Sequence, residues 1–343
     1  MGKKNMLTKR KNRGGREETD QGEDGQLETI LDLRDPVEER REVVGKATVT
    51  VDLSWRRRIA VVSGSNKGIG LETVKQLVST GVKIVLTARD EKKGLEALES
   101  LRELGFSDEF VVFHQLDVAD AASVTSLAHF IKSQFGKLDI LVNNAGVNGV
   151  IIGVKMNLQA LSEDERKRAI SETYELCEEC FEINYYGAKR TVEALLPLLQ
   201  LSDSPTIVNV SSLAGTLQIL SNEWAKGVLS DVEKLTEESI NEVVTEFLKD
   251  FKEGSHERKG WPKTIAAYKV SKVVMNAYTR ILAMMYPKIC INCVCPGYVR
   301  TDITSNTGFS TVEEGASKVV KLALLPNGSP SGFFYSENEI SHF

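Results

Sequence analysis

The stretch IAVVSGSNKGIG, from Ile59 to Gly70, constrains the fold of this chain more than any other feature. Its β-branched residues predict a buried strand that stops at a Ser-Gly pair, and an amphipathic helix pattern begins directly after Gly70. Glycine permits a tight turn and a close approach of the backbone to a ligand, and the N–H groups at a helix start attract anions. We therefore predict a turn that binds the diphosphate of a nucleotide through Gly64, Asn66, Lys67, Gly68, Ile69 and Gly70.

Composition is that of an ordinary globular protein. The 343 residues are enough for a complete core, and 41% of them are hydrophobic. A net charge of -5 gives no electrostatic reason to expect nucleic acid or an anionic membrane as partner. No apolar run approaches the length of a membrane span, and no export signal is recognisable, so we expect a cytoplasmic protein.

Residues 1–54 differ from the rest of the chain. Basic residues crowd the segment that ends at Arg16, acidic residues follow, and apolar residues are too sparse for a core. We interpret this part as a disordered charged tail, while a targeting signal is the alternative for its basic cluster. Residues 55–343 are predicted to form a single α/β domain.

The five cysteines fall into two groups. One is a C-x-x-C pair in a helical pattern and the other lies in a predicted strand. A zinc site would need both groups to converge, so we predict buried packing residues, reduced thiols and no metal. The cysteines are Cys177 and Cys180, then Cys290, Cys293 and Cys295.

The end of the second predicted strand indicates which cofactor binds. An NAD site places a carboxylate there for a ribose hydroxyl. This chain has Ala88 and Arg89 instead, with Lys67 in the glycine turn and Lys93 one helical turn further on. Three cations around one point suit a 2'-phosphate, so we predict NADP(H) in preference to NAD.

Strands and helices alternate through the rest of the chain. This alternation predicts a doubly wound parallel β-sheet, or Rossmann fold, with helices on both faces and ligands at the carboxyl ends of the strands. We predict strands at 59–62, 82–87, 110–114, 139–142, 206–210, 289–295 and 332–335, and helices at 91–104, 121–135, 174–199 and 312–324. Residues 147–170 and 302–310 are predicted loops, the second a candidate substrate lid.

As a set, the motifs resemble the short-chain dehydrogenase/reductase family. They occur in the order and approximate spacing of that family, from Trp55 almost to the C-terminus. The stretches SNKGIGLETV, TARDEKKG, EINYYGAKR and CPGYVRTDI are most similar to carbonyl reductases and to plant menthone, neomenthol and salutaridine reductases. The motifs are the glycine turn, Asp117-Val118, Asn143-Asn144-Ala145-Gly146, Ser211-Ser212, Tyr268-x-x-x-Lys272 and Pro296-Gly297.

The resemblance implies a catalytic set of Asn184, Ser212, Tyr268 and Lys272. Ser212 is assigned by the family pattern Ser-Ser-x-x-Gly, with Ser211 as the alternative. The backbone carbonyl of Asn184 would hold a water on the proton path. Cofactor contacts implied beyond the glycine turn are Arg89, Lys93, Asp117, Val118, Asn144, Ala145, Gly146, Tyr268, Lys272, Pro296, Gly297, Val299 and Thr301.

The spacing of Tyr268 and Lys272 suits proton transfer. Residues four apart on a helix share a face, so both side chains can point into one cleft. We expect the lysine cation and oxidised nicotinamide to lower the pKa of the phenol. The resemblance thus implies an NADPH-dependent reductase of a small apolar ketone or aldehyde, with Tyr268 as general acid or base. Aromatic residues expected either to line its pocket or to pack in the core are Trp224, Trp261, Tyr298 and Phe309.

Two other functions stay open at this point. Some relatives reduce the C=C bond of an enone, but their tyrosine position is altered, so an intact Tyr268 favours carbonyl chemistry. The other alternative is a non-catalytic NADPH-binding scaffold or sensor that uses the N-terminal tail as its contact surface. The complete catalytic set argues against it.

Residues 213–267 form an insertion between the predicted serine and tyrosine. Apolar residues recur at helical spacing from Val232 to Phe251, which predicts an amphipathic helix. The helix either packs on the domain surface or, as the resemblance to monomeric carbonyl reductase implies, blocks the helix face that tetrameric members use. We therefore predict a monomer.

Overall fold

The computed structural model describes residues 39–44, 47–52, 58–152 and 160–341, which divide into two compact units, Met1–Asp52 and Leu53–Phe343. In the first unit, β1 (Glu39–Val44) and β2 (Ala47–Asp52) pair as an antiparallel hairpin. This hairpin lies in the segment for which we predicted disorder. Valine and threonine alternate in β2 and favour a strand, a signal that the low apolar content of the segment concealed. Residues 1–38 of the predicted tail lie outside the described residues.

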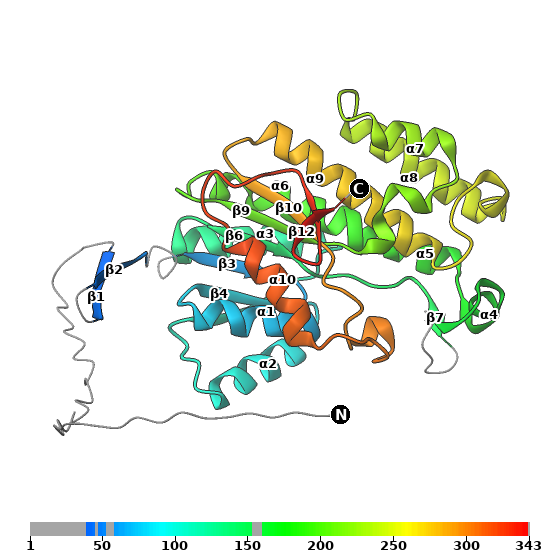
Figure 1. The fold of residues 1–343 in the computed structure, drawn as a ribbon. Coiled ribbons are helices and arrows are strands. Elements are labelled where there is room, and N and C mark those ends of the chain that lie inside the picture. The colour runs from blue at the N-terminus through cyan, green and yellow to red at the C-terminus, as the bar shows by residue number, and fades with distance from the viewer. Residues whose placement is uncertain (1–38, 45–46, 53–57, 153–159, 342–343) are drawn as a thin grey trace, which may run out of the picture. The chain divides into compact units, whose positions relative to one another are not determined.

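The second unit contains an eight-stranded sheet in the order β12-β11-β10-β9-β6-β3-β4-β5 (Figure 1). Every neighbouring pair is parallel except β11 and β12. The strand order reverses between β3 and β6, which is where doubly wound sheets bind their ligands. The predicted fold class is confirmed. The strands are β3 (Ile59–Val62), β4 (Lys83–Ala88), β5 (Val111–Gln115), β6 (Ile140–Asn143), β9 (Thr206–Val210), β10 (Cys290–Val294), β11 (Phe334–Ser336) and β12 (Glu339–Ser341).

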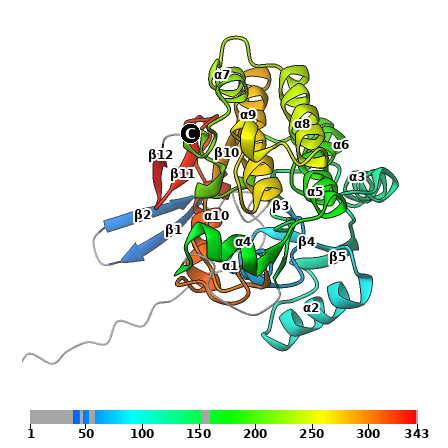
Figure 2. The same ribbon diagram turned by 90° about the vertical axis from the view of Figure 1, so that its right-hand side faces the viewer.

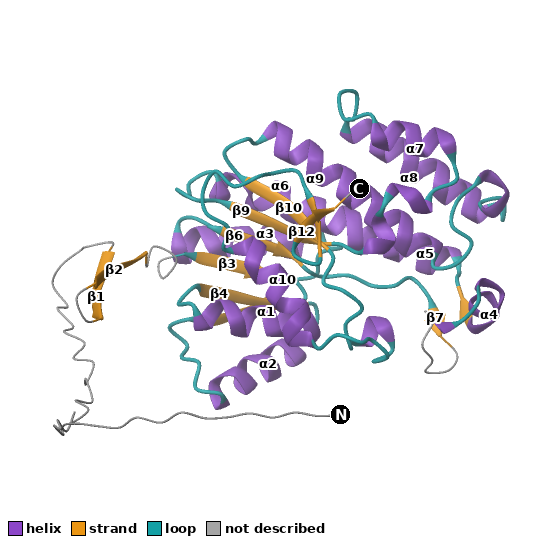
Figure 3. Ribbon diagram, in the orientation of Figure 1, coloured by secondary structure: helices purple, strands orange, loops and turns teal. Residues whose placement is uncertain are grey.

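Helices cover both faces of this sheet, as Figure 3 shows. Alternate residues of β3 enter two different hydrophobic clusters, Ile59 and Val61 on one face and Ala60 and Val62 on the other. Strands buried on both faces explain the continuous apolar runs of the sequence. On the Ala60 face lie α1 (Gly68–Ser79), α2 (Glu91–Glu103) and α10 (Val312–Ala323); on the Ile59 face lie α3 (Ala121–Phe135), α5 (Tyr174–Phe181), α6 (Ala188–Leu199) and α9 (Ala266–Met285).

Two predicted segments have more structure than expected. The predicted loop 147–170 contains β7 (Ile151–Ile152), α4 (Glu163–Ala169) and the start of β8 (Ile170–Ser171), which pairs with β7. A capping box formed by Ser162 and Glu165 starts α4, a signal that was readable in the sequence. The predicted helix 174–199 is interrupted by a π-helical turn, η3 (Glu182–Gly187), between α5 and α6.

The insertion folds into two α-helices, α7 (Glu223–Ser230) and α8 (Glu237–Lys252), and three short turns, η4 (Leu213–Gly215), η5 (Leu217–Ile219) and η6 (Glu257–Lys259). Figures 1 and 2 show α7 and α8 beside α9. The apolar face of α8 is buried, and its Phe247 ring lies 5.5 Å from the ring of Phe181 in α5. Trp261 packs on Phe247 and donates a hydrogen bond from Nε1 to Asp250, so it is a core residue and not a pocket residue.

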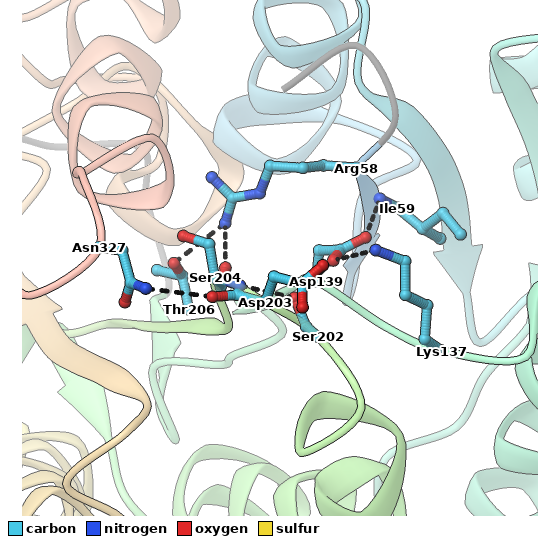
Figure 4. A network of polar contacts seen from close by, with 9 residues as sticks. All are labelled: Arg58, Ile59, Lys137, Asp139, Ser202, Asp203, Ser204, Thr206 and Asn327. Atoms are coloured by element: carbon cyan, nitrogen blue, oxygen red, sulfur yellow. Dashed lines mark hydrogen bonds and ion pairs between the residues drawn. The ribbon is translucent and has the colours of Figure 1, made fainter. Parts of the chain in front are cut away.

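A polar network closes the amino ends of the central strands (Figure 4). The guanidinium of Arg58 donates to the hydroxyl of Thr206 at 3.1 Å. The carboxylate of Asp139 accepts hydrogen bonds from the backbone N–H of Ile59 and the ammonium of Lys137, both at 2.8 Å. Buried polar groups without partners would be costly, so this network stabilises β3, β6 and β9 at the edge opposite their carboxyl ends.

All five cysteines are buried and unpaired, as expected for packing residues. In the part of the chain that the structure describes, no cluster of histidine, cysteine, aspartate or glutamate is arranged to hold a metal ion. Each helix described there is too short or too polar to span a bilayer.

Candidate active site

The glycine turn after β3 and the segment after β6 are bound to each other. The hydroxyl of Ser63 accepts hydrogen bonds from the N–H groups of Asn144 and Ala145, at 2.9 and 3.0 Å. The side-chain amide of Asn144 donates back to the carbonyl oxygens of Ser63 and Gly64. A Cβ on Gly64 would lie 2.9 Å from the Cα of Ala145, so only glycine fits this contact. The two predicted motifs thus form one unit at the reversal of strand order.

Helix α1 begins at Gly68, three residues earlier than we predicted. Gly68 has φ +56, a conformation that glycine adopts readily, which allows the helix to start inside the glycine motif. Lys67 occupies the N-cap position, and its side chain makes no capping hydrogen bond. The first N–H groups of a helix need acceptors, so this uncapped start suits the diphosphate of a dinucleotide.

The segment after β10 packs against the glycine turn. A Cβ on Gly68 would lie 3.4 Å from the Cγ2 of Thr301. A Cβ on Gly315 of α10 would meet both Val299 and Ile69, which places these two side chains around one point. The Pro296-Gly297 turn precedes them, with Gly297 at φ +98. The predicted contacts at 296–301 and at 68–69 therefore lie together.

The three predicted phosphate-binding cations are exposed, and each pairs with a carboxylate. Exposed ion pairs of this kind contribute little, because water screens them and their side chains lose conformational freedom. A 2'-phosphate can therefore replace these carboxylates at small cost, and no carboxylate follows β4 directly to bind a ribose hydroxyl. The pairs are Lys67–Asp302 at 2.5 Å, Arg89–Glu179 at 3.8 Å and Lys93–Asp90 at 3.8 Å.

Asp117 and Val118 follow β5 at the same edge of the sheet. The carboxylate of Asp117 accepts from the N–H of Ala119 at 3.0 Å, and the carbonyl oxygen of Val118 accepts from Arg190 at 2.6 Å. Val118 also packs closely on Gly187, where a Cβ would come within 2.7 Å. The turn is thereby fixed at a position where the resemblance implies a cofactor contact.

The predicted catalytic side chains come together at the start of α9. The hydroxyl of Ser212 lies beside the phenol of Tyr268 and acts on its pKa as a hydrogen-bonding neighbour. The ammonium nitrogen of Lys272 lies 5.7 Å from the centre of the Tyr268 ring and donates to the carbonyl oxygen of Val210 at 2.9 Å. Ser211, the alternative serine, has a buried hydroxyl without a hydrogen-bond partner among the described residues, so the geometry favours Ser212.

Burial dominates the electrostatics of this group. Burial raises the pKa of Tyr268 to about 12, although the hydrogen bond with Ser212 acts in the opposite direction. Burial lowers the pKa of Lys272 to about 8. We expected the lysine to lower the pKa of the phenol, but the surrounding protein groups alone do not achieve this. Tyr268 is therefore protonated at neutral pH, as a proton donor must be.

A close contact between η4 and α9 sets the position of Ser212. The hydroxyl of Ser212 accepts from the N–H of Ala214 at 3.1 Å and so caps η4. A Cβ on Gly215 would lie 2.7 Å from the Cβ of Lys272. The side chain of Asn276 donates to the carbonyl oxygen of Gly215 at 2.9 Å. We had not identified Asn276 from the sequence, because only the fold brings it to this turn.

Asn184 lies in the π-helical turn η3 and is fully buried. Its side chain accepts from the N–H of Val147 at 2.9 Å and donates to the carbonyl oxygen of the same residue, also at 2.9 Å. It also donates to the hydroxyl of Ser271 at 3.0 Å, and Ser271 donates in turn to the carbonyl oxygen of Tyr268. Isolated π-turns in α-helices are frequent at functional sites. The role predicted for the Asn184 carbonyl stays a prediction.

The remaining aromatic candidates lie in different places. Trp224 borders a groove on α7 and α8 whose lining includes none of the predicted site residues. Tyr298 donates or accepts a hydrogen bond with Thr307 at 2.7 Å, and its ring lies 5.5 Å from that of the exposed Phe309. The predicted lid segment carries a short helical turn, η7 (Asp302–Thr304). Whether it moves stays a prediction.

Comparisons with known proteins agree with this geometry. The family model described as short chain dehydrogenase matches residues 58–223. The chain is 56% identical to (+)-neomenthol dehydrogenase of Arabidopsis thaliana, over 83% of this chain and 98% of the relative. It is 35% identical to Carbonyl reductase [NADPH] 1 of Bos taurus, over 82% and 97%. The structure of salutaridine reductase from Papaver somniferum superimposes with a TM-score of 0.78 at 52% identity, covering 81% of this chain and 99% of that one.

Proposed function

The chain belongs to the short-chain dehydrogenase/reductase family, and on that premise we propose that it reduces a small apolar ketone or aldehyde with NADPH. The observation that carries the proposal is the position of the Ser212 hydroxyl beside the phenol of Tyr268, with the ammonium nitrogen of Lys272 5.7 Å from the centre of the Tyr268 ring. A protonated phenol beside a second hydroxyl is suited to bind a carbonyl oxygen and to donate a proton to it.

The residues at the carboxyl edge of the sheet fit NADPH. The uncapped start of α1 would hold the diphosphate, and Thr301 borders it. Arg89 and Lys93, with Lys67, would hold the 2'-phosphate, while Lys272 would orient the nicotinamide ribose. When bound, the nicotinamide supplies the hydride.

In the proposed reaction, Ser212 and Tyr268 donate hydrogen bonds to the substrate carbonyl oxygen. Negative charge develops on that oxygen as its carbon is reduced, and Tyr268 transfers its proton there. The positive charge of Lys272 then stabilises the phenolate that remains on Tyr268. Both groups are withdrawn from water, and the attraction between opposite charges is stronger there than in water. Water held near Asn184 would return the proton to Tyr268. In the reverse direction, the phenolate removes a proton from a secondary alcohol.

The names of the relatives suggest a substrate class. Salutaridine reductase and (+)-neomenthol dehydrogenase are named for an alkaloid and a monoterpenoid alcohol. We propose a ketone of one of these classes as substrate, and an aldehyde as the alternative. NADPH absorbance recorded against terpenoid ketones, alkaloid ketones, quinones and aldehydes tests the proposal, and no oxidation of NADPH with any of them would contradict it.

Reduction of an enone C=C bond is the second candidate chemistry. The intact Tyr268, paired with Ser212, favours reduction at the carbonyl. An enone substrate separates the two reactions, because one yields an unsaturated alcohol and the other a saturated ketone. Identification of the product by mass spectrometry and NMR decides between them.

We also propose that the protein is a monomer. Helix α8 buries four apolar side chains at zero exposure, including Phe247, whose ring packs on Phe181 of α5. Lys189 of α6 forms an ion pair with Glu237 of α8, so the insertion contacts α5 and α6 as well as α9. These helices are the surface that the resemblance assigns to tetramers. Sedimentation equilibrium should give the mass of one chain, and a stable tetramer would reject the proposal.

A further inference from the structure

Glu172 is a half-buried carboxylate that the proposed reaction does not use. It lies between β8 and Thr173, the N-cap residue of α5. Its two carboxylate oxygens accept hydrogen bonds from the backbone N–H groups of Ile265 and Ala266, at 2.5 and 2.8 Å. Ala266 is the first residue of α9, so Glu172 caps the helix that carries Tyr268.

This cap differs from those of the other described helices. Seven of them, α2, α3, α4, α5, α7, α8 and α10, are capped by the side chain of the residue directly before the helix. The residue before α9 is Ile265, whose side chain cannot accept a hydrogen bond. The acceptor comes instead from a residue 93 positions earlier in the chain.

The backbone at Ile265 depends on this interaction. Ile265 has φ 52, in the left-handed region that β-branched residues rarely adopt. Such a conformation persists only where the surrounding structure holds it, and the carboxylate of Glu172 binds the N–H groups of Ile265 and of the residue that follows. Burial raises the pKa of Glu172, and these two hydrogen bonds act in the opposite direction.

Only the first turn of α9 relies on Glu172. Tyr268 is the third residue of the helix, two residues beyond the second hydrogen bond. Lys272 and Asn276, on later turns, have their own hydrogen bonds to Val210 and Gly215. A first turn that loses its cap frays, and fraying displaces the Tyr268 side chain while the rest of the helix stays in place.

We propose that Glu172 is a positioning residue, whose bidentate cap on α9 holds the Tyr268 hydroxyl beside that of Ser212. This inference rests on the proposed function of Tyr268 as proton donor. According to this proposal, proton transfer from Tyr268 depends on the segment between β8 and α5 that contains Glu172. Binding of NADPH does not depend on that segment.

The test compares Glu172→Gln and Glu172→Ala with the wild type, and Glu175→Gln serves as the matched control. Glutamine keeps one acceptor but turns an N–H donor toward the second N–H group, and alanine removes both acceptors. Glu175 is exposed in the first turn of α5, three residues from Glu172, so the control introduces the same substitution at a nearby position. The measurements are kcat, the Kd for NADPH, amide hydrogen exchange and thermal unfolding.

We expect kcat to fall about tenfold in Glu172→Gln and further in Glu172→Ala, because small displacements of a reacting group are costly. The Kd for NADPH should stay within about twofold of the wild type, and exchange should become faster at the N–H groups of Ile265 and Ala266. Glu172→Gln should not lower the unfolding temperature, because the charge that it removes is partly withdrawn from water. A merely structural role would lower stability and kcat together.

Exchange that is unchanged at these N–H groups would overturn the cap. Faster exchange with a kcat no lower than that of Glu175→Gln would overturn the positioning role. If the wild type reduces no carbonyl compound, the proposed function fails instead, and the exchange measurement still decides whether Glu172 holds the first turn.

Discussion

The ammonium nitrogen of Lys272 donates a hydrogen bond of 2.9 Å to the carbonyl oxygen of Val210. Val210 is the last residue of β9, and Ser212 follows two positions later. This bond therefore fixes the strand that delivers Ser212 against the helix that carries Tyr268. Since Lys272 is also buried, one side chain sets the geometry of the site and places a titratable charge inside it.

Replacement of Tyr268 by phenylalanine should lower kcat by about 10²- to 10⁴-fold, the usual contribution of a general acid. NADPH binding should persist, because the glycine turn and the three cations are unchanged. The measurements are the rate of NADPH oxidation and the Kd for NADPH. Full activity in this variant would refute the role of Tyr268.

Tyr278→Phe provides the matched control on the same helix. The hydroxyl of Tyr278 is buried and makes no hydrogen bond with any described residue. Its removal should leave kcat unchanged and stability equal or higher, because an unsatisfied buried polar group carries a desolvation cost. A similar loss of activity in both variants would indicate a general effect on α9.

The course of the parallel sheet was predictable because β3, β4, β6, β9 and β10 are buried along almost their whole length. β3, β9 and α3 have the predicted bounds, and the bounds of the other parallel strands differ by one or two residues. The antiparallel β12 was missed, since three residues at the edge of a sheet leave little pattern. The π-turn at Asn184 was missed because its residues continue a helical pattern.

The site was predictable only where a motif is local in sequence. The spacing of Tyr268 and Lys272 on one helix is such a motif, and so is the glycine turn. Glu172 and Asn276 gave no signal, because each acts on a partner that only the tertiary structure supplies. The raised pKa of Tyr268 in the protein without nicotinamide was not readable from the sequence, since burial is a property of the folded chain.

The stability of the wild type relative to Lys272→Met should rise with pH above about pH 8. In the folded protein Lys272 loses its proton near pH 8, whereas its ordinary pKa is 10.5. Between these values the unfolded chain binds more protons, so the free energy of unfolding increases with pH, by up to about 3 kcal/mol. Denaturant titrations of both proteins across this range measure the difference. A difference independent of pH would contradict the burial of a titrating lysine.

Arg89→Ala should raise the Kd for NADPH about 10- to 100-fold and leave the Kd for NADH nearly unchanged. Hydrogen bonds to charged groups contribute about 1.5 to 3 kcal/mol, and only NADPH carries the 2'-phosphate. Fluorescence titration with each nucleotide measures the effect. Lys92→Ala is the control, because Lys92 is an exposed cation in the first turn of α2 that is not among the predicted cofactor contacts. Equal weakening of both nucleotides would exclude a 2'-phosphate contact.

Gly215→Ala should lower kcat more than any other change of one methyl group in the insertion. The new Cβ would lie 2.7 Å from the Cβ of Lys272 and 2.8 Å from its carbonyl carbon, so either η4 or α9 must shift. Since Ser212 caps η4, the shift separates its hydroxyl from Tyr268, and a displacement of about 1 Å can cost about 10²-fold in rate.

Gly227→Ala is the control for this last change. Gly227 lies inside α7, and a Cβ there would meet nothing within 4 Å. Alanine should therefore leave kcat unchanged and stabilise the protein by about 0.5 to 1 kcal/mol, because glycine is unfavourable within a helix. Kinetics and thermal unfolding of both variants test the contact between η4 and α9. Wild-type kcat in both Gly215→Ala and Gly227→Ala would contradict the prediction. It would mean that the position of Ser212 does not depend on the contact between η4 and α9.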